Sequence, residues 1–197
     1  MSSRNSVPSR ISRRAALKFV GLGCAAAAVS AAPTPLRAAA PAILTGAGDV
    51  RSLNLFNART GEALRTIFWI EGQYVDEACA EANWFLRDWR EDVATRIDPK
   101  TLDIMAAVHQ DLETTEPLEI LSGYRTKKTN DMLRARSRSV ARQSLHCKGM
   151  ACDITLKTRS VNQIYRAAMS LHGGGVGKYS RSDFVHVDSG DVRHWGR

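Results

Sequence analysis

Two histidines and one aspartate stand where each side chain would face away from apolar neighbours. Asp153 lies on the polar face of the alternating stretch 150–156, and His146 precedes it by seven residues. His186 lies on the polar face of the stretch 184–188. A single histidine is more often a hydrogen-bonded core or surface residue, but three such groups together predict a metal centre. Two imidazoles and one carboxylate suit a catalytic zinc with one position open for water, and they also suit other divalent ions, including iron(II).

The sequence around these residues has a specific pattern. Residues 144–153 read S-L-H-C-K-G-M-A-C-D, which fits S-x-H-x-x-G-x-A-x-D at every fixed position, and residues 183–186 read D-F-V-H. In these two elements the chain resembles the zinc D-Ala-D-Ala peptidases of the M15, or LAS, group. The resemblance to the YcbK-like branch of that group runs over roughly residues 51–197. The stretches that carry it are 53–57, 60–62, 97–99, 122–125, 174–177 and 184–188.

The resemblance implies a role for each of five residues. His146, Asp153 and His186 would bind the zinc ion. Asp183, three residues before His186, would be the catalytic base, which takes a proton from the water and passes it to the leaving amine. Arg125, at the end of an S-G-Y-R motif, would hold the scissile carbonyl or its oxyanion.

Three more residues are assigned to the surroundings of the metal or to substrate contact. Asp188 shares the strand face of His186 and is expected to orient that ligand. Ser144 and Tyr124 belong to the two motifs. Asp183 lies an odd number of residues from His186, so strict alternation would turn it to the opposite face. Its role as base therefore requires the strand to begin after it, with Asp183 in the preceding loop.

The remaining sequence must form the elements that position these residues. Apolar alternation predicts strands, apolar residues at helical spacing predict helices, and the Asp-Pro pair at 98–99 is a strong helix start. Strands are expected at 51–56, 64–70, 118–121, 150–156, 176–179 and 184–188, and helices at 76–90, 99–115, 129–136 and 160–171. Short strands mixed with helices predict an α+β fold with a small, mostly antiparallel sheet packed with helices. The resemblance implies that this fold is Hedgehog/DD-peptidase-like.

The charge balance argues against a nucleic-acid-binding protein. The chain of 197 residues has a formal net charge of +8, but six of its 28 basic residues and none of its 20 acidic residues lie in residues 1–40. The rest of the chain has 22 basic residues against 20 acidic ones. A hydrophobic share of 44% is enough for a packed core. No apolar stretch reaches the roughly 20 residues that a transmembrane helix needs.

The N-terminus is typical of an export signal. Residues 12–18 read S-R-R-A-A-L-K, which resembles a twin-arginine signal, and an apolar run of 14 residues follows at 19–32. We therefore expect a signal peptide over residues 1–40, a linker over 41–50 and the zinc peptidase domain over 51–197. The mature protein would be periplasmic, without a stable membrane anchor after signal cleavage. The alternative for this segment is a disordered basic tail.

Two other features leave alternatives open. Cys147 and Cys152 could pair in an oxidising compartment. We expect instead that these cysteines serve as small buried hydrophobic residues, because the mature chain holds an odd three cysteines and no C-x-x-C motif.

The stretch 127–142 holds six basic residues against one acid. It is either a solvated helix face or a surface that attracts anionic wall peptides.

The resemblance and the export signal together imply an exported zinc metallopeptidase that hydrolyses the peptide cross-links of peptidoglycan. Its cofactor would be Zn²⁺, and its partners would be peptidoglycan peptide stems and no nucleic acid; no oligomeric state is predicted. The alternatives are a D-Ala-D-Ala carboxypeptidase and a zinc-stabilised peptidoglycan-binding module without turnover. Asp183 and Arg125 favour an enzyme, since a binding module would need neither. Either the 3-3 or the 4-3 cross-link could be the substrate.

Overall fold

A single sheet runs through the described part of the chain. The computed structural model describes residues 49–196, so the predicted signal peptide and almost all of the predicted linker lie outside the described residues. The strands are β1 (Val50–Asn57), β2 (Glu62–Ile70), β3 (Gln73–Tyr74), β4 (Leu118–Ser122), β5 (Ala151–Thr155), β6 (Gly175–Tyr179), β7 (Phe184–Asp188) and β8 (Arg193–Gly196). Their order in the sheet is β3-β2-β1-β4-β5-β7-β6-β8. Neighbours are antiparallel except for the parallel pairs β1–β4 and β6–β8, which confirms the predicted α+β fold with a mostly antiparallel sheet.

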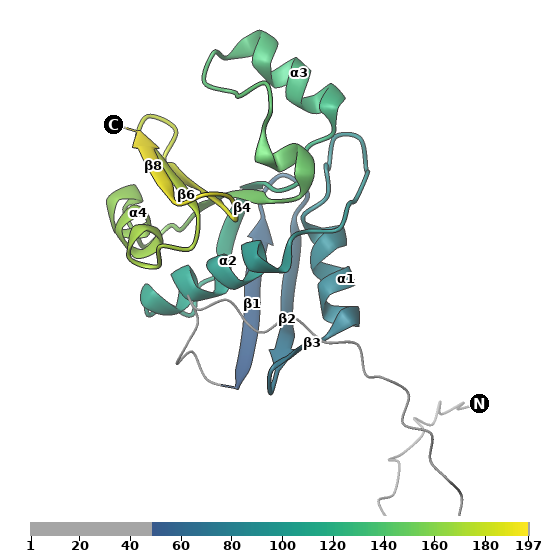
Figure 1. Ribbon diagram of the computed structural model, residues 1–197, viewed down its shortest axis with the longest axis vertical. Coiled ribbons are helices and arrows are strands. Elements are labelled where there is room, and N and C mark those ends of the chain that lie inside the picture. The colour runs from purple at the N-terminus through teal and green to yellow at the C-terminus, as the bar shows by residue number, and fades with distance from the viewer. Residues whose placement is uncertain (1–48, 197) are drawn as a thin grey trace, which may run out of the picture. The chain divides into compact units, whose positions relative to one another are not determined.

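Three of the four α-helices in residues 49–196 contact the sheet. The helices are α1 (Asp76–Phe85), α2 (Pro99–Asp111), α3 (Lys127–Arg136) and α4 (Val161–Ser170). Contacts join α1 to β2, α2 to β1 and β7, and α4 to β6 and β7. The third helix instead projects away from the sheet with the segment that follows it (Figure 1). No described helix is long and apolar enough to cross a membrane.

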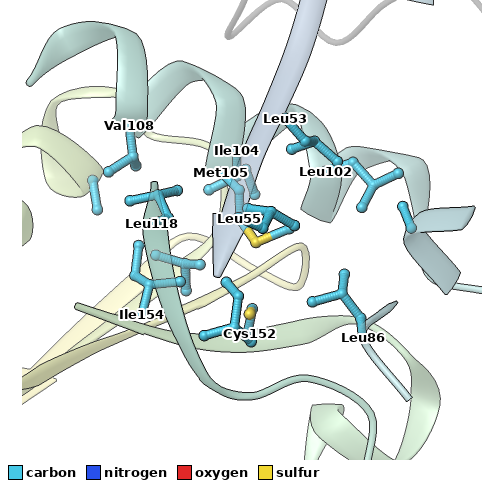
Figure 2. Close-up of a cluster of buried hydrophobic side chains, with 14 of the residues drawn as sticks. Leu53, Leu55, Leu86, Leu102, Ile104, Met105, Val108, Leu118, Cys152 and Ile154 are labelled. Atoms are coloured by element: carbon cyan, nitrogen blue, oxygen red, sulfur yellow. The ribbon is translucent and has the colours of Figure 1, made fainter. Parts of the chain in front are cut away.

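The hydrophobic core lies between these helices and one face of the sheet. Figure 2 shows Leu53 and Leu55 of β1 close to Leu102 and Met105 of α2, with Cys152 of β5 beneath them, and all five are buried. Each strand that crosses the core places alternate residues in it, so the residues between them face the other way. On β5 and β7, those other residues include Asp153, His186 and Asp188 of the candidate site.

The cysteines of residues 49–196 form no disulfide. None of Cys79, Cys147 and Cys152 is joined to another cysteine. Cys152 is buried in the core, and burial raises the pKa of its thiol well above the ordinary value. Its predicted role as a small hydrophobic residue is therefore confirmed, whereas Cys147 is only half-buried.

Local signals shape the first hairpin and the second helix. The β1–β2 hairpin turns at residues 57–61, where Asn57 Oδ1 accepts the backbone N–H of Arg59 at 2.9 Å. Asp98 caps α2 as predicted, because its carboxylate accepts the backbone N–H of Lys100 at 3.1 Å, and Pro99 follows it in the first turn.

The first helix is shorter than predicted, since α1 ends at Phe85 rather than near residue 90. Two bonds to a distant segment draw the chain out of the helix. The carbonyl oxygen of Leu86 accepts the backbone N–H of Tyr124 at 2.8 Å, and the carboxylate of Asp88 accepts that of Thr126 at 2.9 Å. These long-range bonds override the local apolar periodicity.

The second helix also ends earlier than the sequence predicts. α2 ends at Asp111 rather than at residue 115. Beyond it, Glu113 has a left-handed backbone with φ 46°, and Arg159 donates to the carbonyl oxygen of Leu112 at 2.9 Å.

The strands β3 and β8 were not predicted, because both are short edge strands without an apolar alternation.

A buried ion pair joins the sheet to α2. Arg51 donates to Asp103 Oδ1 at 2.8 Å, and the Tyr74 hydroxyl donates to Asp103 Oδ2 at 2.6 Å. The Asp103 side chain is fully buried, and that of Arg51 is 6% exposed. Burial raises the pKa of Asp103 even though both partners bond to it. The pair therefore gains little over an apolar pair, but either charge left alone would strongly destabilise the fold.

We expect Asp103→Ala to lower the free energy of unfolding by about 3–5 kcal/mol, because it leaves the Arg51 guanidinium buried without a counter-ion. The double variant Arg51→Met/Asp103→Leu removes both charges and should recover most of that loss. Urea unfolding followed by circular dichroism measures both changes. A single variant as stable as the wild type would contradict this account of the pair.

Candidate metal centre and active site

Three elements bring His146, Asp153 and His186 together. His146 lies on a short 3₁₀ helix (η2, Leu145–Lys148), and Asp153 lies directly opposite His186 in the antiparallel register of β5 and β7. Gly149 joins η2 to β5 with a left-handed backbone, φ 68°, and a Cβ atom there would lie 2.5 Å from the carbonyl oxygen of Arg96. The backbone path between the first two ligands therefore requires the glycine of the motif.

The ligand atoms of the three residues converge on one point. Asp153 Oδ1 lies 3.2 Å from His146 Nε2 and 2.9 Å from His186 Nδ1, and the two nitrogens are 3.1 Å apart. All three side chains are buried, and their ligand atoms all lie within 4.8 Å of one another. The structure thus brings together every residue predicted as a metal ligand.

The outer nitrogen of each imidazole already has a partner. His146 Nδ1 lies 2.7 Å from the carbonyl oxygen of Gly123, and His186 Nε2 lies 3.0 Å from Asp188 Oδ2. A carbonyl and a carboxylate only accept hydrogen bonds, so each outer nitrogen carries the proton. In the neutral rings, both inner nitrogens then direct lone pairs at the carboxylate oxygen of Asp153. Three acceptors that face one point fit a divalent cation. The hydrogen bonds of the outer nitrogens hold the two rings in the orientation that metal binding needs.

Burial and charge shift the pKa values of the three groups in different directions. Burial lowers the pKa of His146, so this ring favours its neutral form. Burial opposes the ionisation of Asp153, but the two histidines and Arg125 outweigh it and hold its pKa well below the usual range. Burial also disfavours a charged His186, yet its bonds to Asp153 and Asp188 raise its pKa to about 8. The charge of Asp153 thus attracts a cation to the point where the ligand atoms meet.

Arg125 lies beside the predicted ligands. Its Nε donates to Ser122 Oγ at 2.7 Å, and its Nη2 pairs with Asp153 Oδ2. The backbone N–H of Arg125 donates to the carbonyl oxygen of His146 at 3.2 Å, which ties the S-G-Y-R segment to η2. The hydrogen bond from Nε to Ser122 orients the guanidinium. Tyr124, by contrast, is half-buried against the core and does not line the hollow described below.

Asp188 is fully buried behind His186. Besides His186 it binds Arg193, which donates through Nη2 to Oδ2 at 2.7 Å and through Nη1 to Oδ1 at 3.0 Å. Burial opposes ionisation of Asp188, but the bonds from His186 and Arg193 lower its pKa to about 2. This network suits the predicted orienting role of Asp188. Sequence reasoning did not identify Arg193, and no local signal marks it, because it reaches Asp188 only through the pairing of β8 with β6.

A hollow of about 170 Å³ opens onto the three ligands. One part of its wall consists of residues 139–141 and 143–145, which include the predicted substrate-side residue Ser144. Another part consists of three aromatic side chains, Tyr179, Phe184 and Trp195, which the sequence analysis did not single out. Arg125 also lines the hollow, so a peptide bound there can meet the guanidinium and the metal ligands together.

Asp183 lies outside this hollow. It precedes β7, as its predicted role requires, in a left-handed backbone conformation with φ 53°. Its side chain is exposed and lines a different hollow, together with Leu156 and Lys157 beyond the end of β5. The structure therefore does not bring Asp183 to the predicted metal ligands. Asp183 lies in the turn before β7, but from there its side chain does not reach the sheet face that carries His186.

We expect Asp188→Asn to weaken zinc binding by about 10–100-fold, because the variant removes the charged acceptor that orients His186. Competition with a chromophoric chelator measures the dissociation constant. Asp183→Asn changes an exposed acid outside the hollow, so it is the matched control and should bind zinc as the wild type does. Equal affinities for all three proteins would contradict the role assigned to Asp188.

The chain is similar to known peptidases over most of its length. The M15 peptidase family model described as "Peptidoglycan L,D-endopeptidase MepK" matches residues 45–195. The peptidoglycan L,D-endopeptidase MepK of Escherichia coli (strain K12) is 40% identical over 178 residues, which cover 90% of this chain and 95% of the relative. The probable peptidoglycan L,D-endopeptidase MepK of Haemophilus influenzae is 31% identical over 179 residues, with coverage of 90% and 94%. These matches confirm the resemblance seen in the motifs, and the chain belongs to the M15 peptidases of the MepK type.

Proposed function

We propose that this chain is a zinc-dependent endopeptidase that hydrolyses L,D cross-links between the peptide stems of peptidoglycan. One observation carries the proposal: two imidazole nitrogens and a carboxylate oxygen converge beside the Arg125 guanidinium in an open hollow. Three protein ligands with an open position are typical of a catalytic zinc site, whereas structural zinc sites are closed by four. The names of the two relatives support the L,D bond as the one cleaved.

The roles of the residues follow from their positions. When bound, zinc would act as a Lewis acid and lower the pKa of its water to ~7. His146, Asp153 and His186 would hold the ion, and the hydrogen bond between His186 Nε2 and Asp188 would leave Nδ1 of His186 available as a ligand. Arg125 adjoins Asp153, where its permanent charge can bind the scissile carbonyl oxygen and stabilise the negative charge that develops on it.

The surface next to the hollow suits an anionic peptide. In α3, Lys127 pairs with Asp131 and Lys128 pairs with Glu91. Four other basic residues at the end of α3 and beyond it are exposed and have no acidic partner within the described residues. They are Arg134, Arg136, Arg138 and Arg142. Because residues 139–141, between Arg138 and Arg142, line the hollow, we interpret the basic stretch as a surface that attracts the carboxylates of peptide stems.

We also infer that the mature protein acts in the periplasm after export by the twin-arginine route. The two adjacent arginines within residues 12–18, followed by the apolar run at 19–32, support this route. The substrate in the relatives' names, peptidoglycan, lies on the outer side of the cytoplasmic membrane, which supports the location.

Digestion of purified, cross-linked peptidoglycan tests the proposed function. The mature protein is incubated with zinc, with a chelator, and as the His186→Ala variant, and the fragments are resolved by mass spectrometry. We expect a zinc-dependent loss of cross-linked dimers with a gain of monomers, and the fragment masses identify the bond. Release of terminal D-Ala alone would establish a carboxypeptidase instead. Binding to sacculi without cleavage would leave only a wall-binding module.

We expect Arg125→Met to lower kcat by about 10²–10³-fold while zinc stays bound, because all three ligands remain and only the charge that meets the oxyanion is lost. Cleavage of a cross-linked dimer and zinc content are measured on the same samples. Arg166→Met removes an exposed arginine of α4 outside the hollow and serves as the matched control. A kcat for Arg125→Met within about threefold of the wild type would refute the oxyanion role.

The catalytic-base role of Asp183 stays a prediction from the resemblance, and its position outside the hollow argues against it. A general base must lie within hydrogen-bond reach of the proton it takes, and losing one typically costs about 10²–10⁴-fold in rate. We expect Asp183→Asn to keep kcat within about threefold of the wild type in the dimer-cleavage assay. A fall of about a hundredfold or more, with zinc still bound, would restore Asp183 as the base.

A further inference from the structure

Three aromatic side chains beside the metal ligands take no part in the core. Tyr179, Phe184 and Trp195, on β6, β7 and β8, are each half-buried. The half-buried hydrophobic residues that pack against the core lie at other positions. All three aromatic residues line the hollow above the ligands. Core packing therefore does not explain these rings, and part of their surface is free to contact a ligand.

The sheet register aligns Trp195 with the metal ligands. Trp195 pairs with Gly177, Gly177 pairs with His186, and His186 pairs with Asp153, so the four residues form one row across four strands. A Cβ atom on Gly177 would lie 2.5 Å from the Cε2 atom of the indole. The absent side chain at Gly177 thus lets the indole reach over β6, where its ring centroid lies 5.3 Å from that of His186.

The three rings hold one another in place. The Tyr179 and Phe184 rings stack with their centroids 4.5 Å apart and an interplanar angle of 11°. The indole Nε1 of Trp195 donates to the Tyr179 hydroxyl at 3.1 Å. The Arg193 guanidinium lies 5.1 Å from the centroid of the indole ring, within the range of a cation–π contact. The only polar atom of the indole is thus satisfied, and the three rings form a preformed apolar wall.

We propose that Trp195, supported by Tyr179 and Phe184, is the specificity-determining wall that binds the aliphatic side chain of the stem residue next to the scissile bond. This inference rests on the proposed endopeptidase function. A peptide whose carbonyl oxygen meets Arg125 must pass the wall, because both line the same hollow. A methylene chain that ends in a cross-linking amide gains by covering apolar ring faces, whereas a chain that ends in a free ammonium must also lose hydration.

Steady-state kinetics with a purified cross-linked dimer test the wall. Trp195→Ala should raise KM about tenfold, or ~1.4 kcal/mol, and keep kcat within about threefold, because the wall contacts the bound substrate and the transition state alike. Trp195→Phe keeps an aromatic face and should recover most of the affinity. Trp84→Ala removes an exposed tryptophan of α1 outside the hollow, so it is the matched control and should behave as the wild type does.

Calorimetric titration of the zinc-free proteins with the same dimer measures binding without turnover, and zinc content and the thermal midpoint are recorded for each variant. An increase of about tenfold in the dissociation constant of Trp195→Ala, with normal zinc content, supports the wall. Unchanged KM and dissociation constant would overturn it. A fall in kcat alone, or a loss of zinc, would also overturn it, since Trp195 would then act through His186.

The two proposals fail in different ways. A wild-type protein that binds the dimer but does not cleave it would refute the endopeptidase function, and the calorimetric comparison would still decide whether Trp195 contacts the peptide. A wild-type protein that cleaves the dimer, with Trp195→Ala equal to it in KM and dissociation constant, would refute the wall alone.

Discussion

Asp153 and His186 face each other because β5 and β7 pair in one antiparallel register. The same register sets Cys152 opposite Val187, and both of these side chains are buried in the core. A slip of one residue would exchange the two faces, which would move the carboxylate and the imidazole into the core and the apolar side chains to the hollow. Burying an unpaired carboxylate is costly, so the core and the candidate metal centre favour the same register.

Hydrogen bonds hold the polar side chains of β7 in place. His186 is held by Asp188, and Asp188 is held in turn by Arg193 from the edge strand β8. Within residues 49–196, no site side chain is among the buried polar atoms that lack a hydrogen-bond partner. The rings are therefore oriented by the fold itself, and a metal ion does not have to order them. Trp195 lies on the same edge strand, so β8 supports both a predicted metal ligand and the proposed substrate wall.

Local pattern was enough to predict that His146, Asp153 and His186 come together, because strand alternation and a short motif both act within a few residues. The limits of prediction lie where distant segments meet. α1 ends early because Leu86 bonds to a segment almost forty residues later in the chain. β8 has no apolar alternation, and only its pairing with β6 shows that it is a strand. The sequence therefore could not predict that Arg193 and Trp195 lie at the site. Asp183 was predicted to be at the site by a motif, but the turn before β7 carries it to another hollow.

The claim that these three side chains form a zinc site is tested most directly by X-ray absorption spectroscopy of the zinc-loaded protein. We expect two nitrogen ligands at ~2.0–2.1 Å, a carboxylate oxygen at ~2.0–2.2 Å and at least one further light-atom ligand, with no sulfur. The His186→Ala spectrum should lose one imidazole contribution. A sulfur shell at ~2.3 Å would contradict the account, because it would place the ion on a cysteine thiolate such as that of Cys147.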